Sequence, residues 1–180
     1  GLSAVGACEH SNEACISRFL NPGEFYFCGP ECQIHTLLGS CIAITLWHPV
    51  LRIGGMCHFV LPDSGPVKNL EHHTAHLNGR YLNDAMLLFE QAAKKHQTRL
   101  QEYQAKIFGG SNMIVDPLIS QHERIGSRNI EAAIKHLSDL DIPLLIANVG
   151  ETGHRRIVFD VENGDVWVKY EPFQTLPPFK

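Results

Sequence analysis

Hydrophobic and polar positions alternate along several short stretches of the chain, which is the pattern of β-strands that bury one face. Apolar residues alternate with polar or small ones from Ile42 to Trp47, and a second apolar run extends from Ile53 to Leu61. Five residues that include Pro49 separate the two runs. Short strands with such a break between them are predicted to pair as an antiparallel hairpin.

Two later segments show apolar residues three and four positions apart, as in helices that bury one side. The first covers residues 81–96 and the second covers residues 127–140. The apolar positions of the first are Leu82, Ala85, Met86, Phe89, Ala92 and Ala93. We expect Asn78 or Asn83 to cap the first helix and Ser127 to cap the second, because short polar side chains bond to the free N–H groups at helix starts.

The remaining regular segments predict further strands. Residues 103–108 form one such segment, and residues 143–149 form a short continuous apolar run. Segments 156–161 and 165–170 flank Asn163 and Gly164, a residue pair that is typical of a hairpin turn. The C-terminal third is therefore predicted to be β-structure.

Together these elements predict a single α+β domain with a largely antiparallel β-sheet or sandwich, on which two main helices pack. Residues 1–24 show no sustained periodicity and lead into a turn at Asn21, Pro22 and Gly23, so they are expected to form a flexible N-terminal arm. The domain is then predicted to span residues 25–171, followed by a tail at 172–180.

Composition narrows the range of functions. The chain has 180 residues, of which 44% are hydrophobic, enough for the core of one domain. Its net charge of -4, with 15 Lys and Arg residues that form no run, argues against nucleic-acid binding. No stretch approaches the roughly 20 apolar residues of a membrane span, so a soluble protein without membrane insertion is expected. Six cysteines in a chain of this size suggest reduced thiols in the cytoplasm.

Cys41 and His58 are candidates for catalysis. Cys41 follows Gly39 and Ser40 at the start of a predicted strand, where backbone N–H groups can be free. If Pro49 and Val50 are the central turn residues, Cys41 directly opposes His58 across the hairpin, and a slip of one residue would separate them. An imidazole beside a thiol of pKa ~8.5 can stabilise the thiolate as an ion pair. The alternative is that both are ordinary buried residues.

Five segments of the sequence resemble successive signatures of the CheD family, the chemoreceptor glutamine deamidases of bacterial chemotaxis. The segments are residues 21–24, 36–41, 54–62, 106–110 and 125–129. They occur in the family's order, so the resemblance extends from about residue 22 to residue 170.

The resemblance implies a Cys-His-Thr site, which falls on Cys41, His58 and Thr36. The neighbouring His35 is an alternative third member, because family members differ by one residue in this spacing. In the implied reaction the thiolate attacks a glutamine carboxamide, the imidazole protonates the departing ammonia, and water then hydrolyses the thioester. Backbone N–H groups around Gly39 and Ser40 are expected to support the oxyanion.

Other segments are given weaker roles. The residues expected to shape the site or bind substrate are Gly109, Gly110, Ser111, Arg128 and Asn129. No metal or cofactor is expected. Cys28 and Cys32 lie four positions apart, with Cys8, His10 and Cys15 upstream, but a structural zinc site usually shows two closely spaced ligand pairs. Gly153 to Arg156 receives no role.

The resemblance therefore implies an enzyme that converts glutamines of methyl-accepting chemotaxis receptors to glutamate and so tunes chemotaxis adaptation. The same acyl-enzyme chemistry would permit hydrolysis of a glutamyl methyl ester as a side activity. The alternative is a docking or regulatory protein that binds the receptor or a CheC-type phosphatase with little catalysis. A third reading is a cysteine hydrolase on the same scaffold with a different substrate.

Overall fold

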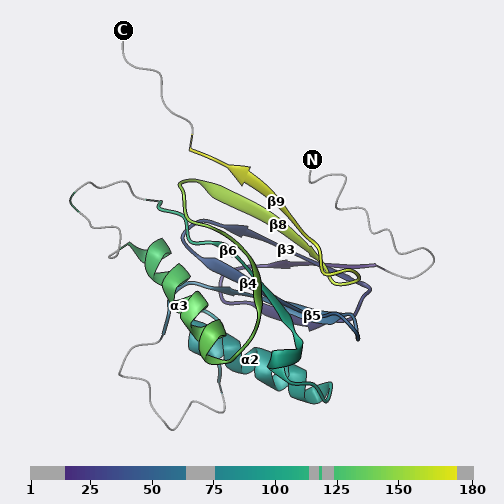
Figure 1. Cartoon of the computed structure of the whole chain (residues 1–180). Helices are drawn as coiled ribbons and strands as arrows, with labels where there is room; N and C mark the ends of the chain where they lie inside the picture. The colour runs from purple at the N-terminus through teal and green to yellow at the C-terminus, as the bar shows by residue number, and fades with distance from the viewer. Residues whose placement is uncertain (1–14, 64–75, 114–117, 119–123, 174–180) are drawn as a thin grey trace.

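The computed structural model describes residues 15–63, 76–113, 118 and 124–173, which form two β-sheets that face each other and two helices. Figure 1 shows these layers, with the helices packed on the face of the five-stranded sheet that is turned away from the other sheet. The four-stranded sheet has the order β1 (Ile16–Leu20), β3 (Cys32–Leu38), β8 (His154–Asp160), β9 (Val166–Glu171). The five-stranded sheet has the order β2 (Phe25–Cys28), β5 (Ile53–Phe59), β4 (Ile42–His48), β6 (Gln104–Gly109), β7 (Leu144–Val149).

The predicted α+β sandwich is confirmed. The helices are α2 (Leu82–Lys95) and α3 (Ile125–Asp139), with a short 3₁₀ turn, η1 (Leu100–Glu102), after α2. Strands β1 and β3 pair in parallel, as do β6 and β7, whereas the other strand pairs of the described chain are antiparallel. Both sheets are therefore mixed but largely antiparallel.

The five-stranded sheet is the middle layer, so its central strand β4 is buried on both faces. Ile42, Ile44 and Leu46 of β4 face the helices, and Ala43 faces the other sheet. Complete burial of an Ile or Leu side chain contributes about 1.5–3 kcal/mol, so this layer holds much of the stability. No helix in the described residues is long and apolar enough to cross a membrane.

Both helices form where the apolar spacing predicts them, but the predicted caps are wrong. Tyr81 occupies the N-cap of α2, and Arg124 occupies that of α3, each in an extended conformation. Ser127 lies inside α3 because the helix begins two residues earlier. Gly126 explains this start: a Cβ there would overlap the carbonyl oxygen of Gly110, so the first turn of α3 is docked tightly on that loop. Tertiary packing thus overrides the local capping preference.

The ordered fold begins earlier than the sequence predicts. Residues Ile16–Leu20 lie in the expected arm, yet they form β1 and pair in parallel with β3. Parallel pairing has no local sequence signature, which is why periodicity missed this strand. Residues 1–14 of the predicted arm and most of the predicted tail lie outside the described residues.

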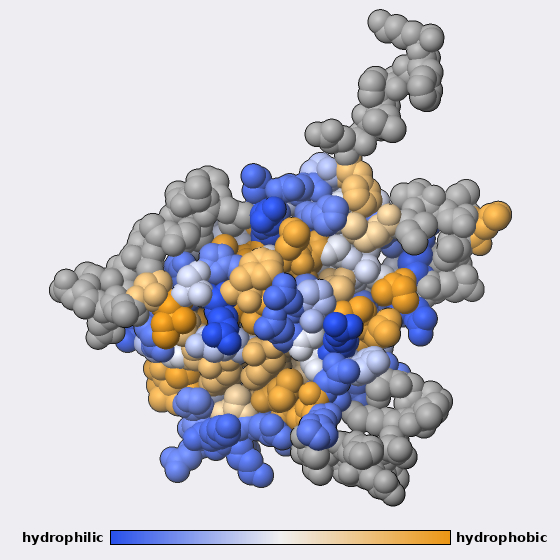
Figure 2. Space-filling model, turned by 180° about the vertical axis from the view of Figure 1, so that it is seen from behind, coloured by the Kyte–Doolittle hydropathy of each residue, from blue (hydrophilic) through white to orange (hydrophobic). Residues whose placement is uncertain are grey.

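The edge strands carry exposed apolar side chains. Phe19 on β1, Leu145 on β7 and Trp167 on β9 are each about half exposed. Figure 2 shows that hydrophobic and hydrophilic residues are interspersed on the face opposite to that of Figure 1. On that face the apolar area is therefore divided among polar neighbours, as on most protein surfaces.

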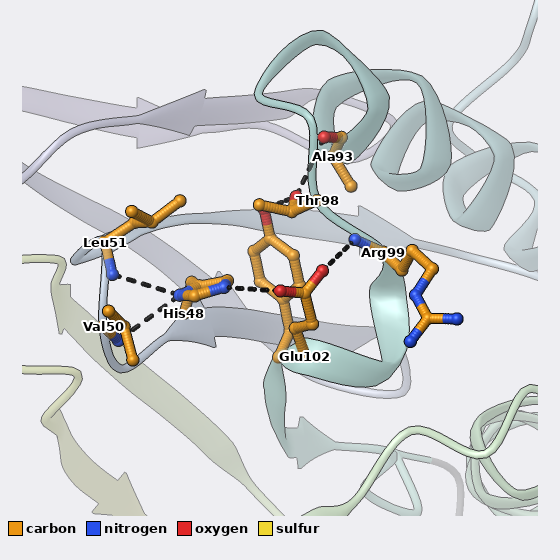
Figure 3. A network of polar contacts seen from close by, with 8 residues as sticks. His48, Val50, Leu51, Ala93, Thr98, Arg99 and Glu102 are labelled. Carbon is orange, nitrogen blue, oxygen red and sulfur yellow. Dashed lines mark hydrogen bonds and ion pairs between the residues drawn. The ribbon is translucent and has the colours of Figure 1, made fainter.

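The β4–β5 hairpin is confirmed, but its turn differs from the predicted one. His48 pairs with Ile53, so four residues form the loop, and the N–H of Arg52 donates to the carbonyl oxygen of His48. The imidazole of His48 holds this loop, because its Nδ1 accepts from the N–H groups of Val50 and Leu51 (Figure 3). The His48 Nε2 lies 3.4 Å from a carboxylate oxygen of Glu102 in η1.

This turn sets the register of the hairpin. In the structure Ala43 directly opposes His58, so the predicted opposition of Cys41 and His58 is wrong by two residues. Side chains alternate between faces with a period of two, so an error of two residues leaves Cys41 and His58 on the same face. The two residues are consequently diagonal neighbours rather than directly opposed ones.

Candidate active site

The candidate residues lie at one end of the sandwich, on the faces that the two sheets turn toward each other. Thr36 lies near the end of β3, Cys41 directly precedes β4, and His58 lies near the end of β5. Cys41 packs against the apolar cluster between the sheets, on the side that Ala43 also faces. Diagonal neighbours in an antiparallel pair have Cβ atoms about 7 Å apart, which a thiol and an imidazole can bridge.

Thr36 contacts the His58 ring directly. The Thr36 hydroxyl lies 2.7 Å from His58 Nδ1 and donates to the carbonyl oxygen of Leu20 at 2.8 Å. Because a hydroxyl has one proton, and this proton is given to Leu20, Thr36 accepts the Nδ1–H of His58. The neutral ring therefore carries its proton on Nδ1, and Nε2 retains the lone pair that a general base needs.

His35 lies on the other face of β3. Its Nε2 is 3.0 Å from the hydroxyl of Ser17 on β1. Consecutive residues of a strand point to opposite faces, so His35 faces away from the sandwich interior that holds Thr36 and His58. Of the two residues that the sequence left as alternatives, the structure brings Thr36 against His58.

Burial favours the neutral forms of both candidate groups. It raises the pKa of the Cys41 thiol above its ordinary value. It lowers the pKa of His58 to about 4, although the negative charge of Glu24 acts in the opposite direction. His58 is 2% exposed, so its imidazolium would lose most of its hydration. Burial thus favours a neutral thiol and a neutral imidazole over the ion pair that the sequence suggests.

The segment Gly39–Cys41, here called the thiol loop, is held by hydrogen bonds to its carbonyl groups. The carbonyl oxygen of Gly39 accepts from Ser111 N at 2.9 Å, and that of Cys41 accepts from Gly110 N at 2.9 Å. The carbonyl oxygen of Ser40 accepts from Asn129 Nδ2 at 3.0 Å. Within the described residues, the N–H groups of Ser40 and Cys41 have no hydrogen-bond partner. These groups are therefore available to a negatively charged oxygen beside the thiol.

Glycine is required next to the thiol loop. Gly109 has φ +106°, and a Cβ at this position would overlap the carbonyl oxygen of Cys41. Gly110 has φ +67°, and a Cβ there would overlap the side chain of Ile130 in α3. Both glycines therefore permit a close approach of chain segments that a side chain would prevent.

The structure brings most of the predicted site-shaping residues to the thiol loop. Asn129 is fully buried and links the loop to the carbonyl oxygen of Val60, to which its Nδ2 also donates at 2.8 Å. Ser111 is equally buried. Arg128 differs, because its side chain is exposed on α3.

Arg155 lies close to the thiol loop, although no role was predicted for it from the sequence. It is 3% exposed, and its Nη1 donates to the hydroxyl of Ser111 at 2.8 Å. The strand pattern contained a signal, because Arg155 shares the inward face of β8 with Ile157 and Phe159. A charged residue in such an alternating inward position is uncommon and indicates a polar partner in the interior.

The other cysteines are separate from this site. Cys57 is buried toward the helices, on the opposite face of β5 from His58, and burial raises its pKa to about 12. Cys28 and Cys32 are also free thiols. Among the described residues, no group of three or more His, Cys, Asp or Glu side chains is placed to hold a metal ion.

Comparison with known proteins identifies the family. Residues 60–170 match the family model described as CheD chemotactic sensory transduction. The chain is 46% identical over 152 residues to the probable chemoreceptor glutamine deamidase CheD 3 of Dechloromonas aromatica, covering 84% of this chain and 86% of that protein. It is 40% identical over 158 residues to the probable chemoreceptor glutamine deamidase CheD of Pseudomonas savastanoi pv. phaseolicola, covering 87% and 86%.

A more distant relative agrees over a similar length. The probable chemoreceptor glutamine deamidase CheD 1 of Leptospira interrogans is 34% identical over 162 residues, which cover 87% of this chain and 94% of that protein. Identities at this level over most of both chains, together with the family-model match, mean that the chain belongs to the CheD family.

Proposed function

We propose that this protein is a chemoreceptor glutamine deamidase, which hydrolyses the side-chain amides of specific receptor glutamines to glutamate and releases ammonia. The observation that carries the proposal is the contact between Thr36 and His58 Nδ1, on the sheet face that also carries Cys41. In this arrangement the Nε2 lone pair of His58 is directed away from Thr36, and the Cys41 thiol lies on the same face of the sheet. The names of the relatives supply the substrate class.

The first chemical step begins from the neutral pair. As the Cys41 sulfur bonds to the amide carbon, His58 Nε2 takes the thiol proton, and the carbonyl oxygen becomes an oxyanion. The N–H groups of Ser40 and Cys41 stabilise this oxyanion, as one such donor can contribute about 10²–10³-fold in rate. Proton transfer by a positioned base typically contributes another factor of about 10²–10⁴.

The remaining steps reuse His58. The carbon–nitrogen bond breaks as the imidazolium gives its proton to the leaving nitrogen, so ammonia departs and a thioester remains on Cys41. His58 Nε2 then takes a proton from water, whose oxygen attacks the thioester carbon. When the carbon–sulfur bond breaks, the imidazolium returns a proton to the Cys41 sulfur and glutamate is released. A glutamyl methyl ester can enter the same sequence with methanol as its leaving group.

The consequence for the receptor is a change of charge. Each turnover converts a neutral amide to a carboxylate, so receptor helices become more anionic at the modified positions, and we propose that this tunes chemotaxis adaptation. Cys41 is only partly buried, which suits a glutamine side chain that projects from the surface of another protein. The proposal places the enzyme in the cytoplasm, with the receptor segments that it modifies.

Intact-mass spectrometry of a cytoplasmic receptor fragment tests the proposal. Incubation with the wild-type protein should add about one dalton for each amide converted to an acid, and peptide mapping should place the gain at glutamines. Cys41→Ala should abolish the gain. The matched control is Cys28→Ala, which removes another free thiol at the far end of β2 and should leave the gain intact.

Absence of any mass gain with the cognate receptor, from a folded protein with a reactive Cys41, would contradict the deamidase proposal. Binding to the receptor or to a CheC-type phosphatase without turnover would then favour the docking role.

A further inference from the structure

Arg155 is a buried cation beneath the candidate site. Its Nε donates to the side-chain oxygen of Asn148 at 2.7 Å, and its Nη1 donates to Ser111 Oγ at 2.8 Å and to the carbonyl oxygen of Gly150 at 2.9 Å. The ring of Tyr170 lies 5.1 Å from the guanidinium carbon. The groups that bond to Nε and Nη1 are thus neutral, and they come from β7, from the segment after β6 and from the loop before β8.

Burying the charge of Arg155 is unfavourable for the free energy of folding. No carboxylate of the described residues lies within salt-bridge distance of Arg155. Removing a charge from water costs several kcal/mol even when neutral groups bond to it, and apolar residues of similar volume often stabilise such positions more. Stability alone therefore does not account for an arginine here.

The contacts of Arg155 lead to the thiol loop through one residue. Ser111 receives the Nη1–H of Arg155 on its hydroxyl, and that hydroxyl donates to the carbonyl oxygen of Gly150 at 3.2 Å. The backbone N–H of Ser111 donates to the carbonyl oxygen of Gly39, the first residue of the thiol loop. Ser111 is fully buried, so movement of its side chain is transmitted to its backbone.

Arg155 also closes the frame around this segment. It holds the carbonyl oxygen of Gly150, whose N–H donates to the carbonyl oxygen of Gly109 at 2.9 Å. Gly109 is the residue on which the Cys41 carbonyl oxygen packs. One side chain therefore fixes the two chain segments, at Gly109 and at Ser111, that set the position of the thiol loop.

We propose that Arg155 is a positioning residue, which acts through Ser111 to hold the thiol loop in the orientation where its N–H groups face the developing oxyanion. This inference rests on the proposed function in taking Cys41 as the nucleophile. It predicts that loss of Arg155 impairs reactions of Cys41 that pass through an oxyanion and spares those that do not.

Two small reagents separate these classes of reaction at Cys41. Acylation by p-nitrophenyl acetate forms a tetrahedral oxyanion and releases p-nitrophenolate, whereas alkylation by iodoacetamide displaces iodide and forms no oxyanion. Both rate constants at Cys41 are followed by peptide mass. The acylation rate constant divided by the alkylation rate constant reports how strongly the protein stabilises the oxyanion. The same ratio for Cys41 in urea-unfolded protein is the reference. Neither reagent involves a receptor, so failure of the deamidase proposal on receptors would leave this measurement intact.

Arg155→Gln should lower the acylation-to-alkylation ratio by about 10- to 100-fold, because a small displacement of oxyanion donors has effects of this size. The matched control is Arg156→Gln on the same strand, whose side chain is 52% exposed and pairs with Glu171. This variant should keep the wild-type ratio.

Ser111→Ala provides a second route if Arg155→Gln does not fold. It removes the hydroxyl that receives Arg155 but keeps the N–H that binds the thiol loop, and we expect a fall of about tenfold. In the double variant the effects should not add, because both changes break the same link.

The proposal is overturned if the folded wild-type ratio does not exceed that of unfolded protein, or if a folded Arg155→Gln stays within threefold of wild type. Equal effects of Arg155→Gln and Arg156→Gln would overturn it as well. If Arg155→Gln does not fold, an unchanged ratio in Ser111→Ala has the same meaning.

Discussion

Replacing Thr36 by valine removes one oxygen atom from the site and keeps the shape of the side chain. Thr36 is 2% exposed, and its hydroxyl contacts the carbonyl oxygen of Leu20 and His58 Nδ1. The substitution leaves both partners buried without their bond, and each such group costs about 1–3 kcal/mol. We therefore expect the free energy of unfolding to fall by about 2–6 kcal/mol.

The catalytic effect follows from the tautomer. Without Thr36 the ring of His58 is free to move its proton to Nε2 or to rotate, and either change removes the base. The free energy that Thr36 contributes to the productive form is that of one buried bond, about 1–3 kcal/mol, which corresponds to about 5- to 150-fold in rate. The value of kcat for receptor deamidation, measured by intact mass under saturating substrate, should fall by this factor.

Thr36→Ser is the matched control, because it keeps the hydroxyl and loses only a methyl group. It should retain kcat within about fivefold, since its oxygen can make the same two bonds. A folded Thr36→Val variant with kcat within threefold of wild type would refute the tautomer argument. Equal losses in the serine and valine variants would also refute it, because the hydroxyl would then not be the important group.

Three further predictions follow from burial and backbone geometry. Because the folded pKa of His58 is about 4 and the unfolded value is ~6.5, its contribution to stability is complete above pH ~6.5 and is lost as pH falls to about 4. Urea unfolding should show a loss of about 3 kcal/mol across this range, and His58→Asn should lack this component. Gly109→Ala should abolish activity because its Cβ overlaps the Cys41 carbonyl, whereas Gly150→Ala, with φ +83° but open space, should cost only about 1 kcal/mol of unfolding free energy. Alkylation of Cys41 by iodoacetamide should accelerate with pH beyond ~8.5, and a plateau near pH 6 would instead indicate an ion pair with His58.

The hairpin shows how far the sequence leads to the site. Alternation in β4 and β5 is sufficient to predict the two strands and to place Cys41 and His58 on one face. The register needs the turn, and the turn is held by His48, whose ring bonds to Val50 and Leu51. Because no short-range rule connects a histidine to a four-residue loop of this kind, the predicted register is wrong, and only the period of two preserves the face.

The alternation of β3 also predicts which of Thr36 and His35 points into the sandwich. Ile34 and Leu38 are buried on the inward face of β3, so residue 36 shares that face and residue 35 does not. The inward position of Arg155 on β8 could also be predicted, since it follows from the alternation of its neighbours. The Arg155 partners Asn148 and Ser111 come from β7 and from the segment after β6, and nothing in the local sequence connects these segments with β8. Their association depends on the tertiary fold.

The position of the candidate site between the sheets explains why burial shifts both pKa values toward the neutral forms. The apolar cluster around Cys41 disfavours a thiolate, and the same environment disfavours an imidazolium at His58. In the proposed mechanism, charge then develops only when an acyl group sits beside the sulfur, where the N–H groups of the thiol loop would stabilise the oxyanion. A neutral thiol also reacts slowly with other electrophiles. In the proposed mechanism, the burial that raises the thiol pKa therefore leaves the fixed thiol loop, rather than an activated thiolate, as the main source of reactivity at Cys41.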